Sequence, residues 1–231
     1  MSTVKGFIFD FNGTLFFDTK LHIKCFQEYC VKFGKPYMTE EYVVGNILGK
    51  SNDLIVRENY NADATAEDIE TFSRDKESYY RNMCLEMPEI FHLVDGACEL
   101  LDYLKEHSIP VCIATGSPIE NIEFYMQYMG LSRWFTLDNI VYCDGSFPGK
   151  PAPDIYERAA AKIGLLPSEC VVFEDGTSGL RAARDAGVEK IIAIYEDGLP
   201  SPVSDDVSPF AVIRTLSGWK DILQKLDIIA N

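Results

Sequence analysis

Residues 4–15 read VKGFIFDFNGTL, and this stretch decides the fold. Its first part, residues 4–9, is short, apolar and rich in Val, Ile and Phe, which is typical of a buried β-strand. The strand leads into a tight loop that begins with Asp10. In an open parallel sheet, the carboxyl ends of the strands meet at a ligand-binding crevice. Asp10 is therefore a candidate nucleophile.

Four later segments also have the character of buried strands, and helical patterns lie between them. The strands are expected over 110–115, 139–142, 170–173 and 190–195. One helix is expected to begin at Asp95 as N-cap, a second at Ser117-Pro118, and two more over 153–163 and 177–186; the last three end at Gly130, Gly164 and Gly187. This alternation predicts an α/β fold with a doubly wound parallel sheet covered on both faces.

Residues 18–90 interrupt this alternation. They show helical periodicity without a convincing strand, over a length far above that of an ordinary loop. Thr65 followed by Asp68 indicates a capped helix start within the segment. We expect a Rossmann-like core domain at 1–17 and 91–231 and an inserted all-helical cap domain at 18–90. Because the insertion directly follows the first strand and its loop, it could cover the site as a lid.

The bulk composition limits the partners. The 231 residues are 47% hydrophobic and 25% charged, which is ordinary for a chain with a packed core. A formal net charge of -15 would repel nucleic acid and anionic lipid, so neither is an expected partner. No leader or membrane-spanning stretch is evident, and the 7 cysteines contain no C-x-x-C pair. We expect a cytoplasmic protein with reduced thiols, and the oligomeric state stays open.

Polar residues follow or flank the predicted strands at their carboxyl ends. They are Asp10, Thr115, Lys150 and Asp175. Each one alone has a structural alternative, since an aspartate after a strand is also a common turn former or helix cap. As a set they predict phosphoryl transfer, in which the Asp10 carboxylate attacks phosphorus and water later releases phosphate.

Attack by one anion on another requires a hard cation and further positive charge. Mg²⁺ suits this role because it prefers oxygen ligands. We expect it to be held by Asp10, the backbone carbonyl of Asn12 and Asp175, with Glu174 as a direct or outer ligand. Lys150 would balance the charge on the phosphoryl oxygens.

The phosphate itself is expected to lie at the start of the helix that follows the second strand. The hydroxyl of Thr115 and the amides of Gly116 and Ser117 would bind its oxygens there, as helix N-termini commonly bind anions.

Four motifs of the chain resemble those of the haloacid dehalogenase (HAD) superfamily. They are FDFNGTL at 9–15, Thr115, Lys150-Pro151 and FED at 173–175, in the order and spacing of that family. The run from 173 to 187 looks like the phosphatase and β-phosphoglucomutase-like branch, whose members carry a helical cap after the first motif. The resemblance implies that Asp10 is the nucleophile of a Mg²⁺-dependent enzyme acting on a small phosphorylated metabolite.

Two residues of the insertion are candidate substrate contacts through this resemblance. Residues 22–26 resemble the first cap helix of the branch, where a histidine faces the cleft, and this makes His22 a candidate. Lys76 is at a cap position suited to bind a substrate anion, with a solvated helix face as the alternative.

A phosphonate-cleaving enzyme would need a cap lysine for a Schiff base. Lys50 and Lys76 lie in the right region, but nothing in the sequence shows that either is desolvated.

Asn12 departs from the family pattern, in which a second aspartate protonates the leaving alkoxide and then activates water. An amide cannot transfer that proton, and such help is worth roughly 10²–10⁴ in rate. Sugar alkoxides should suffer most, and acyl or aryl phosphates least. The sequence therefore predicts a slow or selective phosphohydrolase. The alternative is a non-catalytic protein that binds a phosphate ligand or has a regulatory role.

Overall fold

The computed structural model describes residues 4–32, 34–48 and 52–229, so Lys50 lies outside the described residues. It divides into two compact units, Met1–Phe17 with His92–Asn231 and Asp18–Phe91. We call the first the core unit and the second the helical unit, and each is described by itself.

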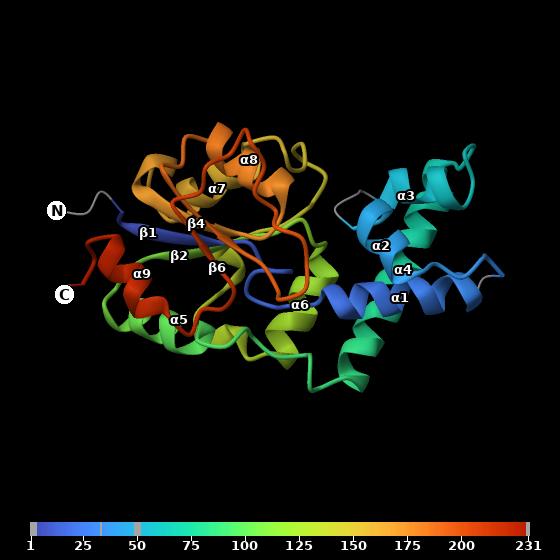
Figure 1. The fold of residues 1–231 in the computed structure, drawn as a ribbon, viewed down its shortest axis with the longest axis horizontal. Helices are drawn as coiled ribbons and strands as arrows, with labels where there is room; N and C mark the ends of the chain where they lie inside the picture. The colour runs from blue at the N-terminus through green and yellow to red at the C-terminus, as the bar shows by residue number, and fades with distance from the viewer. Residues whose placement is uncertain (1–3, 33, 49–51, 230–231) are drawn as a thin grey trace. The chain divides into compact units, whose positions relative to one another are not determined.

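The core unit is built on a parallel sheet in the order β3-β2-β1-β4-β5-β6 (Figure 1). The strands are β1 (Gly6–Phe9), β2 (Val111–Ala114), β3 (Ile140–Val141), β4 (Cys170–Glu174), β5 (Lys190–Ile194) and β6 (Ala211–Ile213). Phe9 lies opposite Phe173 in the register, and their rings stack 4.9 Å apart between centroids. Such a pair contributes about 0.5–1.5 kcal/mol beyond burial. The predicted α/β fold with a doubly wound sheet is confirmed.

Helices cover both faces of this sheet. They are α5 (Ala97–Glu106), α6 (Ile119–Tyr128), α7 (Asp154–Lys162), α8 (Thr177–Asp185) and α9 (Trp219–Lys225). Figure 1 shows α7 and α8 on one face and α5 and α9 on the other. Buried Ala and Leu side chains of α7 and α8 pack with Val172 of β4, which closes the core on that side. On the other side, the ring of Tyr103 lies 5.0 Å from that of Trp219.

Five predicted strands are present, and the sequence missed β6. This strand has only three residues, lies at the edge of the sheet beside β5, and leaves Val212 50% exposed. A short edge strand needs neither a continuous apolar run nor strict alternation, so periodicity gave no signal for it.

Helix ends were predicted well at their carboxyl termini. Gly130, Gly164 and Gly187 follow α6, α7 and α8 with φ of 67°, 72° and 85°, the left-handed conformation expected of glycine there. The predicted N-cap Asp95 is wrong, because Gly96 caps α5 with φ 87°. A Cβ at Gly96 would collide with the backbone of Leu216, and the carbonyl of Asp95 accepts from the Leu216 amide at 3.0 Å. Asp95 therefore anchors a distant loop.

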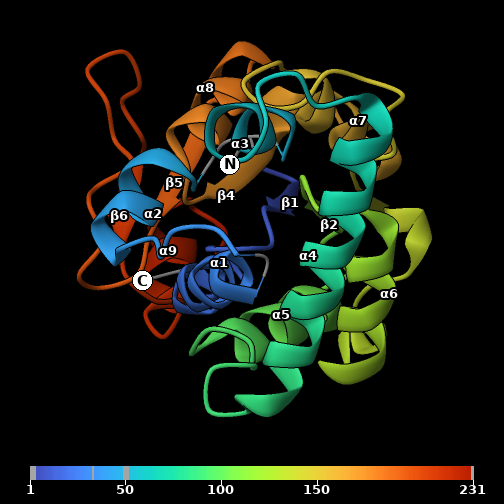
Figure 2. The same ribbon diagram turned by 90° about the vertical axis from the view of Figure 1, so that its right-hand side faces the viewer.

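The helical unit contains α1 (Thr19–Lys32), α2 (Glu40–Asn46), α3 (Asn52–Asn59) and α4 (Ala66–Glu86), which can be followed in Figure 2. α1 packs against α4, and the unit has its own apolar core that includes Phe26, Val43 and Phe72. The predicted capped start is confirmed, because Thr65 and Asp68 form a reciprocal capping box at the start of α4. Among the described residues, no helix combines the length and apolar character needed to cross a bilayer.

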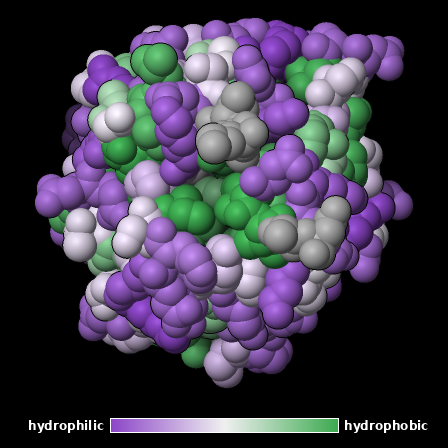
Figure 3. Space-filling view, turned by 90° about the vertical axis from the view of Figure 1, so that its left-hand side faces the viewer, coloured by the Kyte–Doolittle hydropathy of each residue, from purple (hydrophilic) through white to green (hydrophobic). Residues whose placement is uncertain are grey.

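The edge at which the strands of the core unit begin differs from the edge at which they end. Figure 3 views the molecule from the side of the chain termini and shows hydrophobic side chains gathered between hydrophilic ones. At this edge the side chains of Ile163 and Leu165 fill the space beside Gly6. Charged groups gather instead at the opposite edge.

Candidate active site

The candidate site lies where the strand order of the core sheet reverses. β1 and β4 are neighbours, although the chain visits β2 and β3 between them. In doubly wound sheets, ligands bind at the carboxyl ends of the strands beside such a point. Asp10 directly follows β1, Glu174 ends β4 and Asp175 comes next. The Asp10 amide donates to the Phe173 carbonyl at 2.9 Å, which fixes the loop to the neighbouring strand.

The structure brings these three carboxylates together. One oxygen from each of Asp10, Glu174 and Asp175 lies within 4.8 Å of the others. Asp10 is 6% exposed and Glu174 is 2% exposed, so little water screens their mutual repulsion. Buried like charges at this distance require a compensating cation.

Lys150 supplies part of that compensation. Its Nζ lies 2.5 Å from Asp10 Oδ1 and 2.5 Å from Glu174 Oε1. Burial of the lysine disfavours its charge, but the two carboxylates outweigh burial and raise the pKa of Lys150 well above its usual value. Lys150 is therefore a fixed ammonium ion that bridges the ends of β1 and β4.

Glu174 is held on every side by the protein. The hydroxyl of Tyr156 donates to Oε1 at 3.0 Å, and the Gly176 amide donates to Oε2 at 2.8 Å. Burial raises the pKa of Tyr156 well above its usual value, so it acts as a neutral donor. A Cβ at Gly179 would overlap the Glu174 carboxylate. Sequence reasoning missed Tyr156 and Gly179, although a glycine inside a helix can indicate close approach of another group.

A second glycine makes room for Asp175. Gly13 has φ 79°, and a Cβ there would overlap the Asp175 carboxylate. The loop after β1 thus passes against the end of β4, and only glycine allows this approach.

The predicted phosphate-binding residues lie where β2 gives way to α6. Thr115 is 1% exposed, and its Oγ1 accepts the Ser117 amide at 3.1 Å. Two of the predicted phosphate donors therefore bond to each other in this structure. Gly116 has open space around it.

Asn12 is tied to two side chains from elsewhere in the core unit. Its Nδ2 donates to the Tyr125 hydroxyl at 3.0 Å, and its Oδ1 accepts from the Ser117 hydroxyl at 2.7 Å. The Tyr125 ring is fully buried and stacks on Phe11 at 4.5 Å between centroids. Nothing in the sequence singled out Tyr125, which lies 113 residues from Asn12 in the chain.

The two candidate residues of the helical unit are engaged within that unit. His22 Nε2 lies 3.0 Å from Asp18 Oδ2, and the His22 ring stacks on Tyr80 at 4.5 Å. Lys76 is 5% exposed and pairs with Glu77. The alternative of a solvated helix face for Lys76 is therefore wrong, because the turn of α4 directs this side chain inward.

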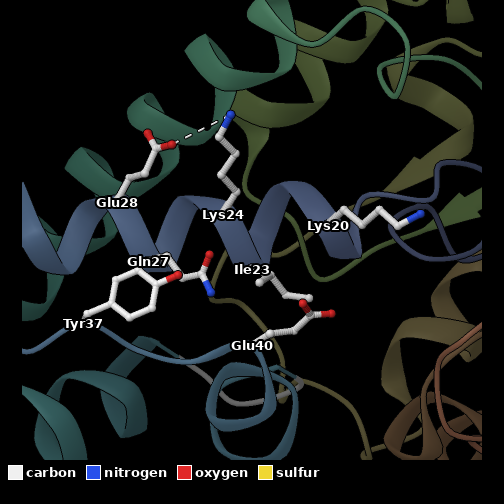
Figure 4. A pocket seen from close by; sticks show the side chains of 7 residues that line it. All are labelled: Lys20, Ile23, Lys24, Gln27, Glu28, Tyr37 and Glu40. Atoms are coloured by element: carbon white, nitrogen blue, oxygen red, sulfur yellow. Dashed lines mark ion pairs between the residues drawn. The ribbon is translucent and has the colours of Figure 1, made fainter.

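A pocket of about 480 Å³ also lies along α1 in the helical unit (Figure 4). Its lining is mixed in charge and comprises Lys20, Ile23, Lys24, Gln27, Glu28, Tyr37 and Glu40. Lys24 and Glu28 pair at 3.8 Å. None of the predicted site residues lines this pocket.

Comparison with known protein families shows which family has a sequence like that of this site. The family model described as haloacid dehalogenase-like hydrolase matches residues 4–187, which include every residue of the acidic cluster. The chain belongs to this family. The predicted HAD superfamily is thereby confirmed. The predicted class of enzyme, a phosphatase-type hydrolase, is confirmed by relatives that are named as phosphatases.

Individual relatives agree with this HAD assignment. Fructose-1-phosphate phosphatase YqaB of Escherichia coli K12 is 30% identical over 186 residues, covering 80% of this chain and 94% of the relative. A phosphorylated carbohydrates phosphatase of Thermotoga maritima is 26% identical over 195 residues, covering 83% and 85%. The crystal structure of a family IA HAD hydrolase from Entamoeba histolytica has a TM-score of 0.85 and 34% identity, covering 99% of this chain and 100% of that chain.

Proposed function

We propose that this HAD hydrolase is a Mg²⁺-dependent phosphohydrolase that releases phosphate from a small phosphorylated metabolite through an aspartyl-phosphate intermediate on Asp10. The observation that carries this proposal is the convergence of Asp10, Glu174 and Asp175 within 4.8 Å, with Lys150 in contact with two of them. The relatives named as phosphatases of phosphorylated sugars support the substrate class.

The residues present fit Mg²⁺. Three carboxylates and one ammonium leave a formal charge of -2 in a buried place, which a divalent cation would balance. Asp10, Asp175 and the backbone carbonyl of Asn12 would hold the ion through oxygen atoms. Both oxygens of Glu174 already accept protein donors, which supports an outer role for this residue. When bound, Mg²⁺ would neutralise charge on the phosphoryl oxygens.

The chain's own residues supply the remaining chemistry. The Asp10 carboxylate attacks phosphorus, and the Lys150 ammonium, already 2.5 Å from Asp10, reduces the repulsion between the two anions. Thr115 and Gly116, at the end of β2, would orient the phosphate. Water then attacks phosphorus and restores the Asp10 carboxylate.

We propose that residues 18–90 act as the cap that selects the substrate. Its own core supports an independent role for this segment. His22 keeps 21% side-chain exposure, which supports its use as a substrate contact. Lys76 already has its charge balanced by Glu77, which makes it the weaker candidate.

The test is phosphate release from a panel of phosphorylated metabolites with Mg²⁺. The wild-type protein should release phosphate from at least one of them, and Asp10→Asn should abolish this release because the amide is not a nucleophile. Asp138→Asn, which changes an exposed aspartate of the core unit, is the matched control. If no substrate gives release that depends on Asp10, the proposal is wrong.

A second candidate function is favoured by the amide at position 12, which cannot transfer protons. The chain would then be a non-catalytic protein that binds or senses a phosphate ligand. This candidate predicts Mg²⁺-dependent binding of inorganic phosphate or a metabolite, measured by calorimetry, with no turnover over hours.

A further inference from the structure

The amide of Asn12 is bonded at both ends by neighbouring parts of the core unit. Ser117 lies two residues before α6 and Tyr125 lies within it, so α6 and the turn that leads into it supply the two partners. The contact distances are 2.7 Å to the Ser117 hydroxyl and 3.0 Å to the Tyr125 hydroxyl. We call these two contacts the Asn12 clamp.

The clamp has little freedom to rearrange. The Tyr125 ring is fully buried, stacked on Phe11 and edge-on to Phe16 at 6.0 Å between centroids. Phe11 and Phe16 belong to the loop that carries Asn12. The same aromatic packing therefore holds both the tyrosine and the loop that carries residue 12.

The two charged side chains in contact with each other beside Asp10, Lys150 and Glu174, are already engaged by the protein. The Lys150 ammonium is held by two carboxylates, and Glu174 accepts hydrogen bonds through both oxygens. The side chain two positions after Asp10 is the neutral amide of Asn12, which is bonded to Tyr125 and Ser117 in the clamp. A leaving group must then depart without a proton from this loop.

We propose that the Asn12 clamp makes Tyr125 and Ser117 positioning residues that restrict this site to phosphate compounds whose leaving group departs as a stable anion, such as acyl and aryl phosphates. The inference rests on the proposed function. A bond forms between an Asp10 oxygen and phosphorus while the bond from phosphorus to the leaving oxygen breaks. The electron pair stays on that oxygen. Water later displaces Asp10 from phosphorus, which restores the carboxylate and gives inorganic phosphate that keeps at least one proton of the water.

The experiment measures kcat/KM for acetyl phosphate, p-nitrophenyl phosphate, phenyl phosphate and glycerol 2-phosphate. The wild-type protein should lose about 10²–10⁴ in kcat/KM between the first and last compounds, the range that general acid help supplies. The same series is measured for Asn12→Asp, Tyr125→Phe and the double variant. These changes test whether the clamp, beyond the identity of residue 12, sets the preference.

In Asn12→Asp, the Tyr125 and Ser117 hydroxyls should keep the new carboxylate turned toward α6, so kcat/KM for glycerol 2-phosphate should rise less than about 3-fold. Adding Tyr125→Phe frees that carboxylate and should give at least a further 10-fold on glycerol 2-phosphate, because misplacement of a reacting group costs up to about 10²-fold. Acetyl phosphate should change little. Tyr128→Phe, on the same helix but 51% exposed, should add nothing to Asn12→Asp.

Ser117→Ala combined with Asn12→Asp tests the other contact of the clamp. Thermal unfolding shows whether each variant is folded, and the serine variant replaces Tyr125→Phe if the tyrosine variant is not. Equal kcat/KM for alkyl and acyl phosphates in the wild-type protein, abolished by Asp10→Asn, would overturn the inference and leave the proposed function standing. Asn12→Asp alone matching the double variant would also overturn it. If no compound gives Asp10-dependent release, the proposed function itself fails.

Discussion

The core unit and the helical unit each hold a lysine that is largely shielded from water, with 13% of the Lys150 side chain and 6% of the Lys76 side chain exposed, but they balance its charge in different ways. Lys150 contacts two carboxylates and lies 5.2 Å from the centre of the Tyr156 ring. Lys76 pairs with the single carboxylate of Glu77 and lies 5.3 Å and 5.9 Å from the rings of Phe26 and Tyr80. Cation–π contacts of this kind stabilise a desolvated ammonium ion.

The difference indicates which of the two lysines lies in a site suited to bind an ion. Lys76 with Glu77 forms a neutral pair, so this position needs no further ion. Around Lys150 the two contacting carboxylates already outnumber the ammonium, and Asp175 adds a third carboxylate to the same cluster. A buried excess of negative charge is unfavourable for folding alone and points to a ligand cation.

Replacing Lys150 with methionine should have the largest effect. The variant loses the charge beside Asp10, the proposed nucleophile, and kcat for phosphate release should fall by about 10²–10³, as it does when one preorganised donor is removed from other active sites. Mg²⁺ should restore part of the lost stability, because the ion can replace some of the missing positive charge. Lys225→Met, at an exposed position, is the control. Retained turnover would contradict the assigned role.

Removal of Mg²⁺ comes next. With free Mg²⁺ at 100 times its dissociation constant, binding to the folded state should add about 2.7 kcal/mol to the free energy of unfolding. Chemical denaturation with Mg²⁺ and with EDTA measures this difference. Asp175→Asn should lose most of it, whereas Glu77→Gln in the helical unit should keep it. If Mg²⁺ raised the free energy of unfolding equally in both variants, the surroundings of the two lysines would not differ in their need for a cation.

Lys76→Met should destabilise the protein by on the order of 2 kcal/mol, because it leaves the Glu77 carboxylate without its cation in a place where that side chain is 13% exposed. Combining it with Glu77→Gln removes both charges and should recover most of the loss. Urea denaturation of the two single variants and the double variant measures the coupling. If Mg²⁺ rescued Lys76→Met, the two lysines would not differ as argued.

The smallest effect is expected from the tyrosines beside the two lysines. Tyr156→Phe deletes the hydrogen bond to Glu174, and Tyr80→Phe deletes the bond from Tyr80 to Asp18 at 2.6 Å. Each should cost about 1.5 kcal/mol of stability, since each hydroxyl donates to a carboxylate. Only Tyr156→Phe should also weaken the stabilisation by Mg²⁺, by several-fold in apparent affinity. If Tyr80→Phe weakened the stabilisation by Mg²⁺ equally, the loss would not depend on contact with Glu174.

The sequence predicted the convergence of the acidic cluster because strand ends are local features. An apolar run followed by an aspartate places Asp10 and Asp175 at the same edge of any parallel sheet. Burial of Lys76 had a signal as well, since Phe72 and Tyr80 lie four residues to either side of it on one helix face. A solvated face stays an alternative for Lys76 at the level of sequence because lysine is seldom buried without a partner.

The contacts of Asn12 had no such signal. Its partner Tyr125 is distant in the chain, and a tyrosine on the buried face of a helix is ordinary core packing. Which hydroxyl meets which amide depends on how far α6 is displaced and rotated over the sheet, and periodicity does not specify this. Prediction from pattern therefore finds the charged residues of the site more readily than the neutral groups that contact them.

The glycine at position 179 has a consequence for the history of the family. The carboxylate of Glu174 occupies the volume that any larger residue at this helix position would need. The two positions should therefore covary, so that homologues which lose the glycine carry a shorter acid at the end of the fourth strand. An alignment of related chains can be searched for that exchange.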